Sequence, residues 1–158
     1  RKPFVFLFFI LFTSSCHFEE YWPMYSILPI EGETILINQN PDMFSFLYGV
    51  RNDFEQMKTG IYVEEFDLQW DGTNFKSVNC KQDCGIFDFG EESFYDYTGF
   101  SPENRQFELS KEGILNHLYL IKINYEGRSV YYKFKILEMN SDYFKNYSWI
   151  RFQWKLTY

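Results

Sequence analysis

Cys80 and Cys84, with Lys-Gln-Asp between them, are the side chains whose spacing most directly indicates chemistry. A structural zinc site needs about four ligands, and no histidine lies near this pair to complete one. Redox-active cysteines are usually spaced by about two residues in a strand–helix context, whereas these flank a longer predicted loop. In an oxidising compartment the pair is therefore predicted to form a local disulfide that closes this loop.

The remaining candidate ligands are one histidine and one methionine. His117 lies just ahead of a predicted strand and Met139 just after another, so both lie at strand ends that could face a cleft. Each has a simpler alternative: a solvent-facing or hydrogen-bonded turn for His117, and loop packing for Met139. His17, next to Cys16, is a poor candidate. With one usable histidine and no Gly-x-Ser-x-Gly elbow, neither an enzyme nor a metal site is predicted.

The N-terminal segment has the layout of a secretory signal peptide. Two cations precede nine apolar residues, 4–12, and Thr13-Ser14-Ser15-Cys16 follows. A helix of this length spans only ~14 Å against ~30 Å of hydrocarbon, which is too short for a stable transmembrane anchor. Cys16 after two small residues resembles a bacterial lipobox, in which the cysteine is lipidated and becomes the first residue. The alternative is ordinary cleavage, with Cys16 free or disulfide-bonded.

Lipidation at Cys16 fits the cysteine count, because it leaves a single pair out of three cysteines. It predicts a signal peptide over residues 1–15, a lipid-anchored tether over 16–33 and a single β domain over 34–158. The predicted location is the bacterial outer membrane, reached through the lipid anchor. The acidic pair Glu19-Glu20 resembles a surface-export signal and predicts exposure at the cell surface.

Composition narrows the classes of protein to consider. The 158 residues are 23% aromatic, which is enough apolar area to build a folded core and argues against a disordered chain. The formal net charge is −7, and no basic stripe occurs. Because nucleic-acid binding depends on clustered Lys and Arg that neutralise phosphates, a nucleic-acid partner is not predicted.

The elements that must position these residues are predicted to be strands. Alternating apolar and polar residues are typical of half-buried strands, because successive side chains point to opposite faces. Such patterns occur over residues 34–38, 66–70, 75–78, 107–109, 119–125, 130–136 and 150–158. Apolar residues from Met43 to Met57 recur near helical spacing and favour a helix there. The predicted fold is all-β: a single-domain antiparallel sandwich or distorted barrel with at most one or two short helices.

Two stretches of the sequence carry a resemblance to a known family. Residues 66–79 form an aromatic-Asp-aliphatic strand, a turn, a second strand and an Asn. Residues 119–136, which include Tyr131-Tyr132-Lys133, form a hairpin, and an aromatic strand over 150–154 follows. Together they resemble the HmuY-like haem-binding lipoproteins of Bacteroidetes-type bacteria. The chain departs from that family where the Cys80/Cys84 loop replaces a Gly-rich loop, and it is shorter than typical members.

The resemblance implies a surface lipoprotein that captures haem and delivers it to an outer-membrane receptor. Haem iron is held by axial His, Met, Cys or Tyr side chains. The haem-ligand candidates are His117 and Met139, although the family's own ligand positions fall where the match fails. The surplus of aromatic residues supports an alternative: a surface β module that binds glycan or protein through exposed aromatics, without haem.

Overall fold

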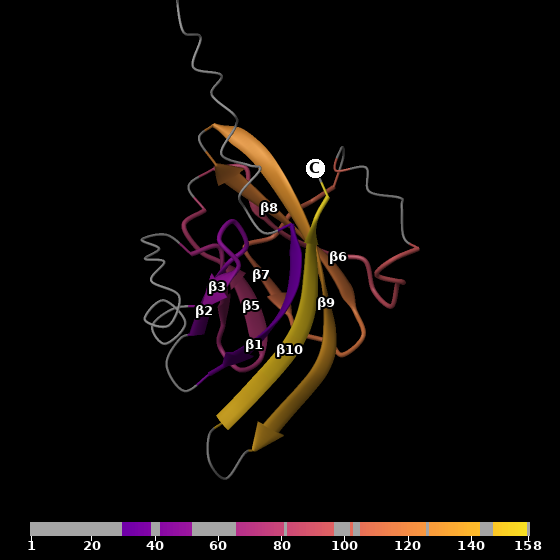
Figure 1. The fold of residues 1–158 in the computed structure, drawn as a ribbon. Coiled ribbons are helices and arrows are strands. Elements are labelled where there is room, and N and C mark those ends of the chain that lie inside the picture. Colours follow the sequence, from indigo (N-terminus) through magenta and orange to yellow (C-terminus); the bar gives the residue numbers. More distant parts are fainter. Residues whose placement is uncertain are drawn as a thin grey trace, which may run out of the picture.

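The computed structural model describes residues 30–38, 42–51, 66–80, 82–96, 102, 105–125, 127–142 and 147–157. Within these ranges the chain forms ten strands and no helix. The strands pair antiparallel in two five-stranded sheets (Figure 1). The predicted all-β fold is therefore confirmed.

The first sheet, called here the long sheet, contains the two longest strands of the described residues. Its strand order is β1 (Glu31–Ile37), β10 (Tyr147–Leu156), β9 (Arg128–Asp142), β8 (Leu118–Tyr125) and β6 (Gly85–Asp88). β9 and β10 extend past the other strands at one end (Figure 1). Ile136 pairs with Phe152 but Glu138 pairs with Arg151, so Leu137 is the extra residue of a β-bulge.

The second sheet, called here the short sheet, is built from strands of two to four residues. Its order is β3 (Val50–Arg51), β2 (Asp42–Ser45), β4 (Leu68–Trp70), β5 (Asn74–Ser77) and β7 (Ser110–Glu112). Asp71 ends β4 and shapes the turn into β5, because its carboxylate accepts the N–H groups of Thr73 and Asn74 at 3.0 and 2.7 Å.

The central core lies between the two sheets and is mainly aromatic. Phe46, from the turn after β2, stacks on Tyr132 and contacts Phe134, with ring centroids 5.2 and 5.7 Å away. Phe75 of the short sheet meets Phe134 at 5.1 Å. Each such side chain contributes roughly 1.5–3 kcal/mol by burial, so these contacts across the sheets hold the sandwich together.

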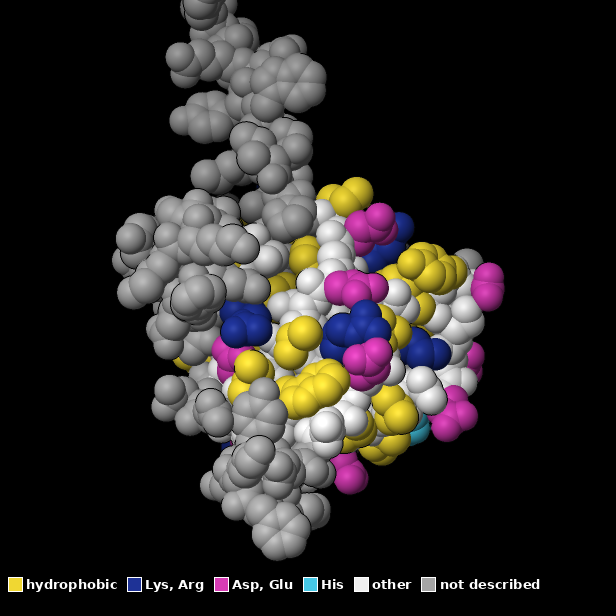
Figure 2. Space-filling model, turned by 60° about the horizontal axis from the view of Figure 1, so that its bottom comes forward, with side chains coloured by type: hydrophobic (Ala, Val, Ile, Leu, Met, Phe, Trp, Pro, Cys, Tyr) yellow, Lys and Arg dark blue, Asp and Glu magenta, His cyan; other side chains and the backbone are white. Residues whose placement is uncertain are grey.

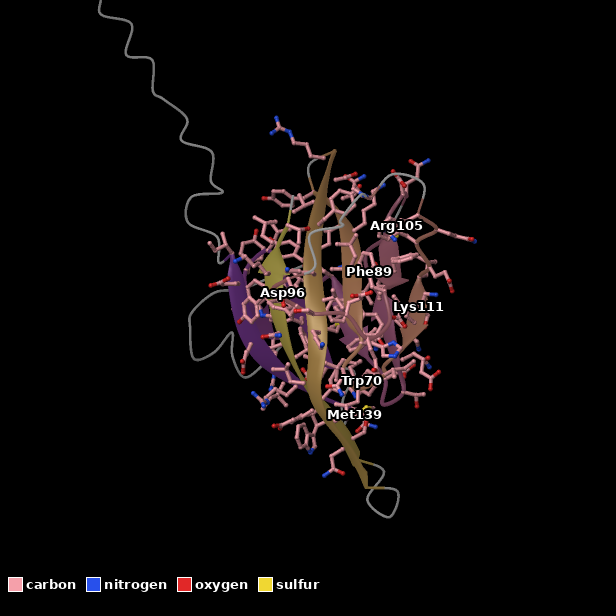
Figure 3. The ribbon with its side chains drawn as sticks, turned by 90° about the vertical axis from the view of Figure 1, so that its right-hand side faces the viewer. Trp70, Phe89, Asp96, Arg105, Lys111 and Met139 are labelled. Atoms are coloured by element: carbon pink, nitrogen blue, oxygen red, sulfur yellow. A yellow bond between two sulfur atoms is a disulfide. The ribbon has the colours of Figure 1, made fainter. Side chains whose placement is uncertain are left out.

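A second cluster, the outer core, covers the opposite face of the long sheet. Phe94, Leu118 and Leu120 are buried there beneath the segment that follows β6. Arg105 lies 4.5 Å above the ring of Phe89 (Figure 3), and Lys133 lies 4.7 Å from the ring of Phe94. The long sheet is therefore covered on both faces in this region.

Several predicted elements need correction. Residues 42–51 form β2, a turn and β3 where a helix was predicted over 43–57, and residues 52–57 lie outside the described ranges. A helix would turn one face to the core, but every side chain from Phe44 to Leu47 is buried. Glu108 makes only an isolated bridge with Ile86, and the nearby strand begins at Ser110. β1 begins at Glu31, earlier than the predicted strand.

Candidate functional site

A cavity of about 380 Å³ opens between the two sheets at the end of β8. One wall is the turn after β2, which contributes Leu47 and Tyr48. The facing wall is the end of β8, which contributes Asn124 and Tyr125. The residues that follow β5 close the cavity and include Cys80. Ligand sites in proteins have volumes of roughly 300–1,000 Å³, so this cavity fits a small ligand.

The buried carboxylate of Asp67 orders one wall of the cavity. It accepts a hydrogen bond from the Phe46 N–H at 2.8 Å and one from the Ser45 hydroxyl at 3.2 Å. The backbone carbonyl of Asp67 accepts the Val78 N–H at 3.1 Å. One residue therefore fixes the turn that carries Tyr48 and also the chain leaving β5.

The predicted disulfide between Cys80 and Cys84 is confirmed, and both cysteines line the cavity. The loop is attached at two further points. The Asn79 side chain donates to the Phe66 carbonyl at 2.9 Å, and Asp83 lies 2.5 Å from the Lys122 ammonium. Asn79 and Asp83 have φ angles of 55° and 52°, a left-handed conformation that Asn and Asp tolerate better than most residues.

The chemistry of the lining is polar with an aromatic rim. Tyr48 is 38% exposed, and Tyr125 lines the facing wall. Ser77, Asn79 and Asn124 supply hydroxyl and amide groups, which both donate and accept hydrogen bonds. The cavity therefore offers a mixed set of hydrogen-bonding groups together with the flat faces of aromatic rings.

His117 lies at the opposite end of β8, roughly 25 Å from Tyr125 at the usual rise per strand residue. Its Nδ1 lies 3.1 and 3.0 Å from the two carboxylate oxygens of Asp88. A carboxylate only accepts, so in the neutral imidazole Nδ1–H donates and Nε2 carries the lone pair. This is the hydrogen-bonded turn histidine that the sequence left open as the alternative.

Met139 lies within β9, because that strand continues to Asp142 and does not end before the methionine as expected (Figure 3). Its side chain is 41% exposed. The Ile136 N–H donates to the His117 carbonyl at 3.3 Å, so Met139 is roughly 10 Å farther along the neighbouring strand. The two haem-ligand candidates thus lie at the same end of adjacent strands, and neither lines the cavity. Cys16 lies outside the described residues.

Comparisons with known proteins give no assignment. No protein-family model, curated protein or solved structure matches this chain. The resemblance to HmuY-like lipoproteins therefore stays a prediction from strand patterns. The part of the chain that the structure describes contains no apolar helix of bilayer-spanning length. The same part of the chain holds no group of three or more His, Cys, Asp or Glu side chains arranged for a metal ion.

Sequence reasoning found the disulfide but missed the cavity around it. The sequence places Asp67 within an alternating strand, and this local pattern does not indicate its bond to the turn after β2. Asp88, which binds His117, lies 29 residues away in sequence and carries no local signal. The one usable clue was Asn79 beside Cys80, because an Asn next to a short disulfide loop favours a fixed turn.

Proposed function

We propose that this chain is an exported, lipid-anchored binding protein of the outer-membrane surface rather than an enzyme. Its cavity receives one or two sugar residues of a glycan. The observation that carries this proposal is the pairing of Tyr48 and Tyr125 with hydroxyl and amide groups in a single small cavity. A glycan is one of the two ligands in the alternative that the surplus of aromatic residues supports.

A sugar matches this lining for two reasons. Its hydroxyl groups need partners that both donate and accept, which Asn124, Asn79 and Ser77 provide. Its C–H faces pack against flat rings with an apolar body and a polar tip, which tyrosine provides. Asp67 also lines the cavity, but its carboxylate already accepts the Phe46 N–H and the Ser45 hydroxyl, so the favoured ligand is neutral.

The test is calorimetric titration of the full chain, purified in a polyoxyethylene detergent that has no sugar headgroup. The probes are neutral hexoses, N-acetylhexosamines and their β-linked disaccharides. At least one probe is expected to bind, and Tyr48→Ala is expected to weaken its binding about tenfold, the loss of about 1.4 kcal/mol of ring contact.

The matched control is Tyr95→Ala. Tyr95 is 74% exposed and does not line the cavity, so its removal is expected to leave affinity unchanged. The proposal is rejected if no probe produces a heat of binding, or if Tyr48→Ala and Tyr95→Ala bind the probe with equal affinity.

A second candidate function is haem binding, with delivery to an outer-membrane receptor. One observation favours it: Asp88 holds Nδ1 of His117, which leaves Nε2 as the ligating nitrogen. Histidines that bind metals usually donate their other ring N–H to a carboxylate or carbonyl in this way. Met139 is a second axial candidate on the adjacent strand, and Ile114 and Leu115, which are 37% and 42% exposed, are apolar side chains within three residues of His117.

Titration of the full chain with hemin tests this candidate. Binding is expected to shift the Soret band, and His117→Ala is expected to abolish the shift. Asp88→Asn is expected to weaken binding about 10–100-fold, the usual cost of losing such a partner. The control is His17→Ala, which removes the other histidine of the sequence. This variant should bind hemin as the parent does. A shift that survives in His117→Ala, or no shift in either iron oxidation state, excludes this site.

A further inference from the structure

The Cys80–Cys84 disulfide is part of the wall of the proposed ligand cavity. Both cysteines line the cavity and are half-buried, and Asp83 between them has a side chain that is 78% exposed. This loop also joins the two sheets, since it leads from β5 in the short sheet to β6 in the long sheet. A change in the conformation of this loop therefore alters the shape of the cavity and does not require the central core to rearrange.

The other attachments of the loop are weaker than the covalent bond. The ion pair between Asp83 and Lys122 joins a buried lysine to a carboxylate that is 78% exposed, so solvent screens the pair on the Asp83 side. The Asn79 side chain makes one hydrogen bond to a backbone carbonyl. Asn79 and Asp83, on either side of Cys80, both have positive φ angles. Without the crosslink, both residues can relax to the more favourable negative φ region.

We propose that this disulfide is a redox latch on the cavity: the oxidised loop holds the ligand, and the reduced loop releases it. The proposal rests on the proposed function of the cavity. The reductant is a dithiol protein or a small dithiol in the compartment to which the chain is exported. Its thiolate attacks one sulfur to form a mixed disulfide, and its second thiol then resolves that bond. The net transfer is two electrons and two protons to Cys80 and Cys84, and the reductant leaves as its own disulfide.

Two features of the structure favour a latch over a purely structural crosslink. The disulfide closes a local loop between residues four apart and does not join distant parts of the chain, so the sandwich does not depend on it. Its sulfur-bearing residues are half-buried beside an open cavity, which gives an attacking thiolate access. The Val78 N–H, bonded to the Asp67 carbonyl, is the backbone link between the loop and the ordered wall.

The experiment compares the oxidised full chain, the same chain reduced with dithiothreitol, and the double variant Cys80→Ser/Cys84→Ser. The probe is the neutral sugar with the highest affinity in the calorimetric panel. Affinity is expected to fall at least fivefold in the reduced and double-variant proteins and to recover on reoxidation of the parent. Equal affinity in all three proteins overturns the latch while leaving glycan binding intact.

Amide hydrogen exchange provides a readout that needs no ligand. On reduction, exchange over residues 78–84 is expected to rise at least tenfold while β9 and β10 stay protected. If no sugar binds the oxidised protein, the proposed function fails, and this exchange result alone decides whether the loop is released by reduction. Unchanged exchange in the loop, or a rise across the whole chain, overturns the latch.

Discussion

At the scale of single residues, the buried phenol of Tyr119 shows how one polar atom fixes a turn. Its hydroxyl donates to the Glu112 carbonyl at 2.8 Å and accepts the Ile114 N–H at 2.9 Å. Burial raises the pKa of this phenol, so it stays protonated. Tyr119→Phe leaves both backbone groups without their partner and is expected to lower the free energy of unfolding by about 1–2 kcal/mol. Urea denaturation measures the change.

The control for this prediction is Tyr95→Phe, which removes the hydroxyl of a tyrosine that is 74% exposed. Its stability should match the parent within about 0.5 kcal/mol, as for most surface changes. If Tyr119→Phe is as stable as Tyr95→Phe, the hydroxyl does not hold this turn.

Lys133 is a buried cation in the outer core, 7% exposed, whose ammonium donates to the Phe94 carbonyl. Burial, and then the nearby charge of Lys155, lowers the pKa of Lys133. Between this lowered value and the ordinary lysine pKa, the unfolded chain holds a proton that the folded chain has lost. Stability therefore rises with pH in that alkaline window. Lys133→Met is expected to remove this part of the rise.

Denaturation at several alkaline pH values up to about 10.5, the ordinary lysine pKa, measures the slope. The comparison variant is Lys135→Met, a more exposed lysine of the same strand face that donates to the Glu92 carbonyl at 2.7 Å. The slopes of both variants are compared with that of the parent. The burial argument is wrong if the free energy of unfolding depends on pH equally in Lys133→Met and in the parent.

At the scale of elements, the strands with clean alternation could be predicted from the sequence. The patterns over 119–125, 130–136 and 150–158 correspond to β8, β9 and β10, because each of these strands has one face in the central core. β9 is longer than predicted. The bulge at Leu137 shifts the alternation of side chains by one residue, so the sequence pattern does not indicate that the strand continues to Asp142.

The cavity could not be predicted because its walls meet only through pairing between distant strands. The turn at Leu47 and Tyr48 approaches the Cys80/Cys84 loop through the register of β2, β4 and β5, which no local pattern specifies. The helical spacing near Met43 arose from consecutive buried residues in a strand and turn. The disulfide was predictable because its chemistry is local in sequence.

Ser148 of β10 links the long sheet to the short sheet. The Trp70 indole N–H donates to its hydroxyl at 3.3 Å, and the Asn38 side-chain oxygen accepts the Ser148 N–H at 2.7 Å. Ser148→Ala removes the acceptor for a buried indole and is expected to cost about 1–2 kcal/mol in urea denaturation. The control, Ser129→Ala, removes an exposed serine of β9 and should have no effect. Equal stability of the two variants would show that the sheets do not depend on this contact.

At the scale of the whole molecule, the described domain has different chemistry at its two ends. The cavity with the disulfide lies at one end of β8, and His117 with Met139 lies at the other. Figure 2 shows a surface where Lys and Arg side chains lie beside Asp and Glu side chains, with hydrophobic groups between them. Arg151, for example, bonds Glu33 and Glu138 across three strands. Such local pairing leaves no extended basic face in this view, consistent with a net charge of −7.

The proposed location of the molecule depends on Cys16, since several acyl chains on one cysteine bind a membrane durably. Cells fed an alkyne fatty acid are expected to label the full chain and to retain it in the membrane fraction. Cys16→Ser should lose the label and leave that fraction, whereas Cys80→Ser/Cys84→Ser should be labelled as the parent is. The alternative, ordinary cleavage, predicts no label in the parent and an intact mass without acyl chains. Label that persists in Cys16→Ser would place the anchor at another residue and remove the basis for the proposed location.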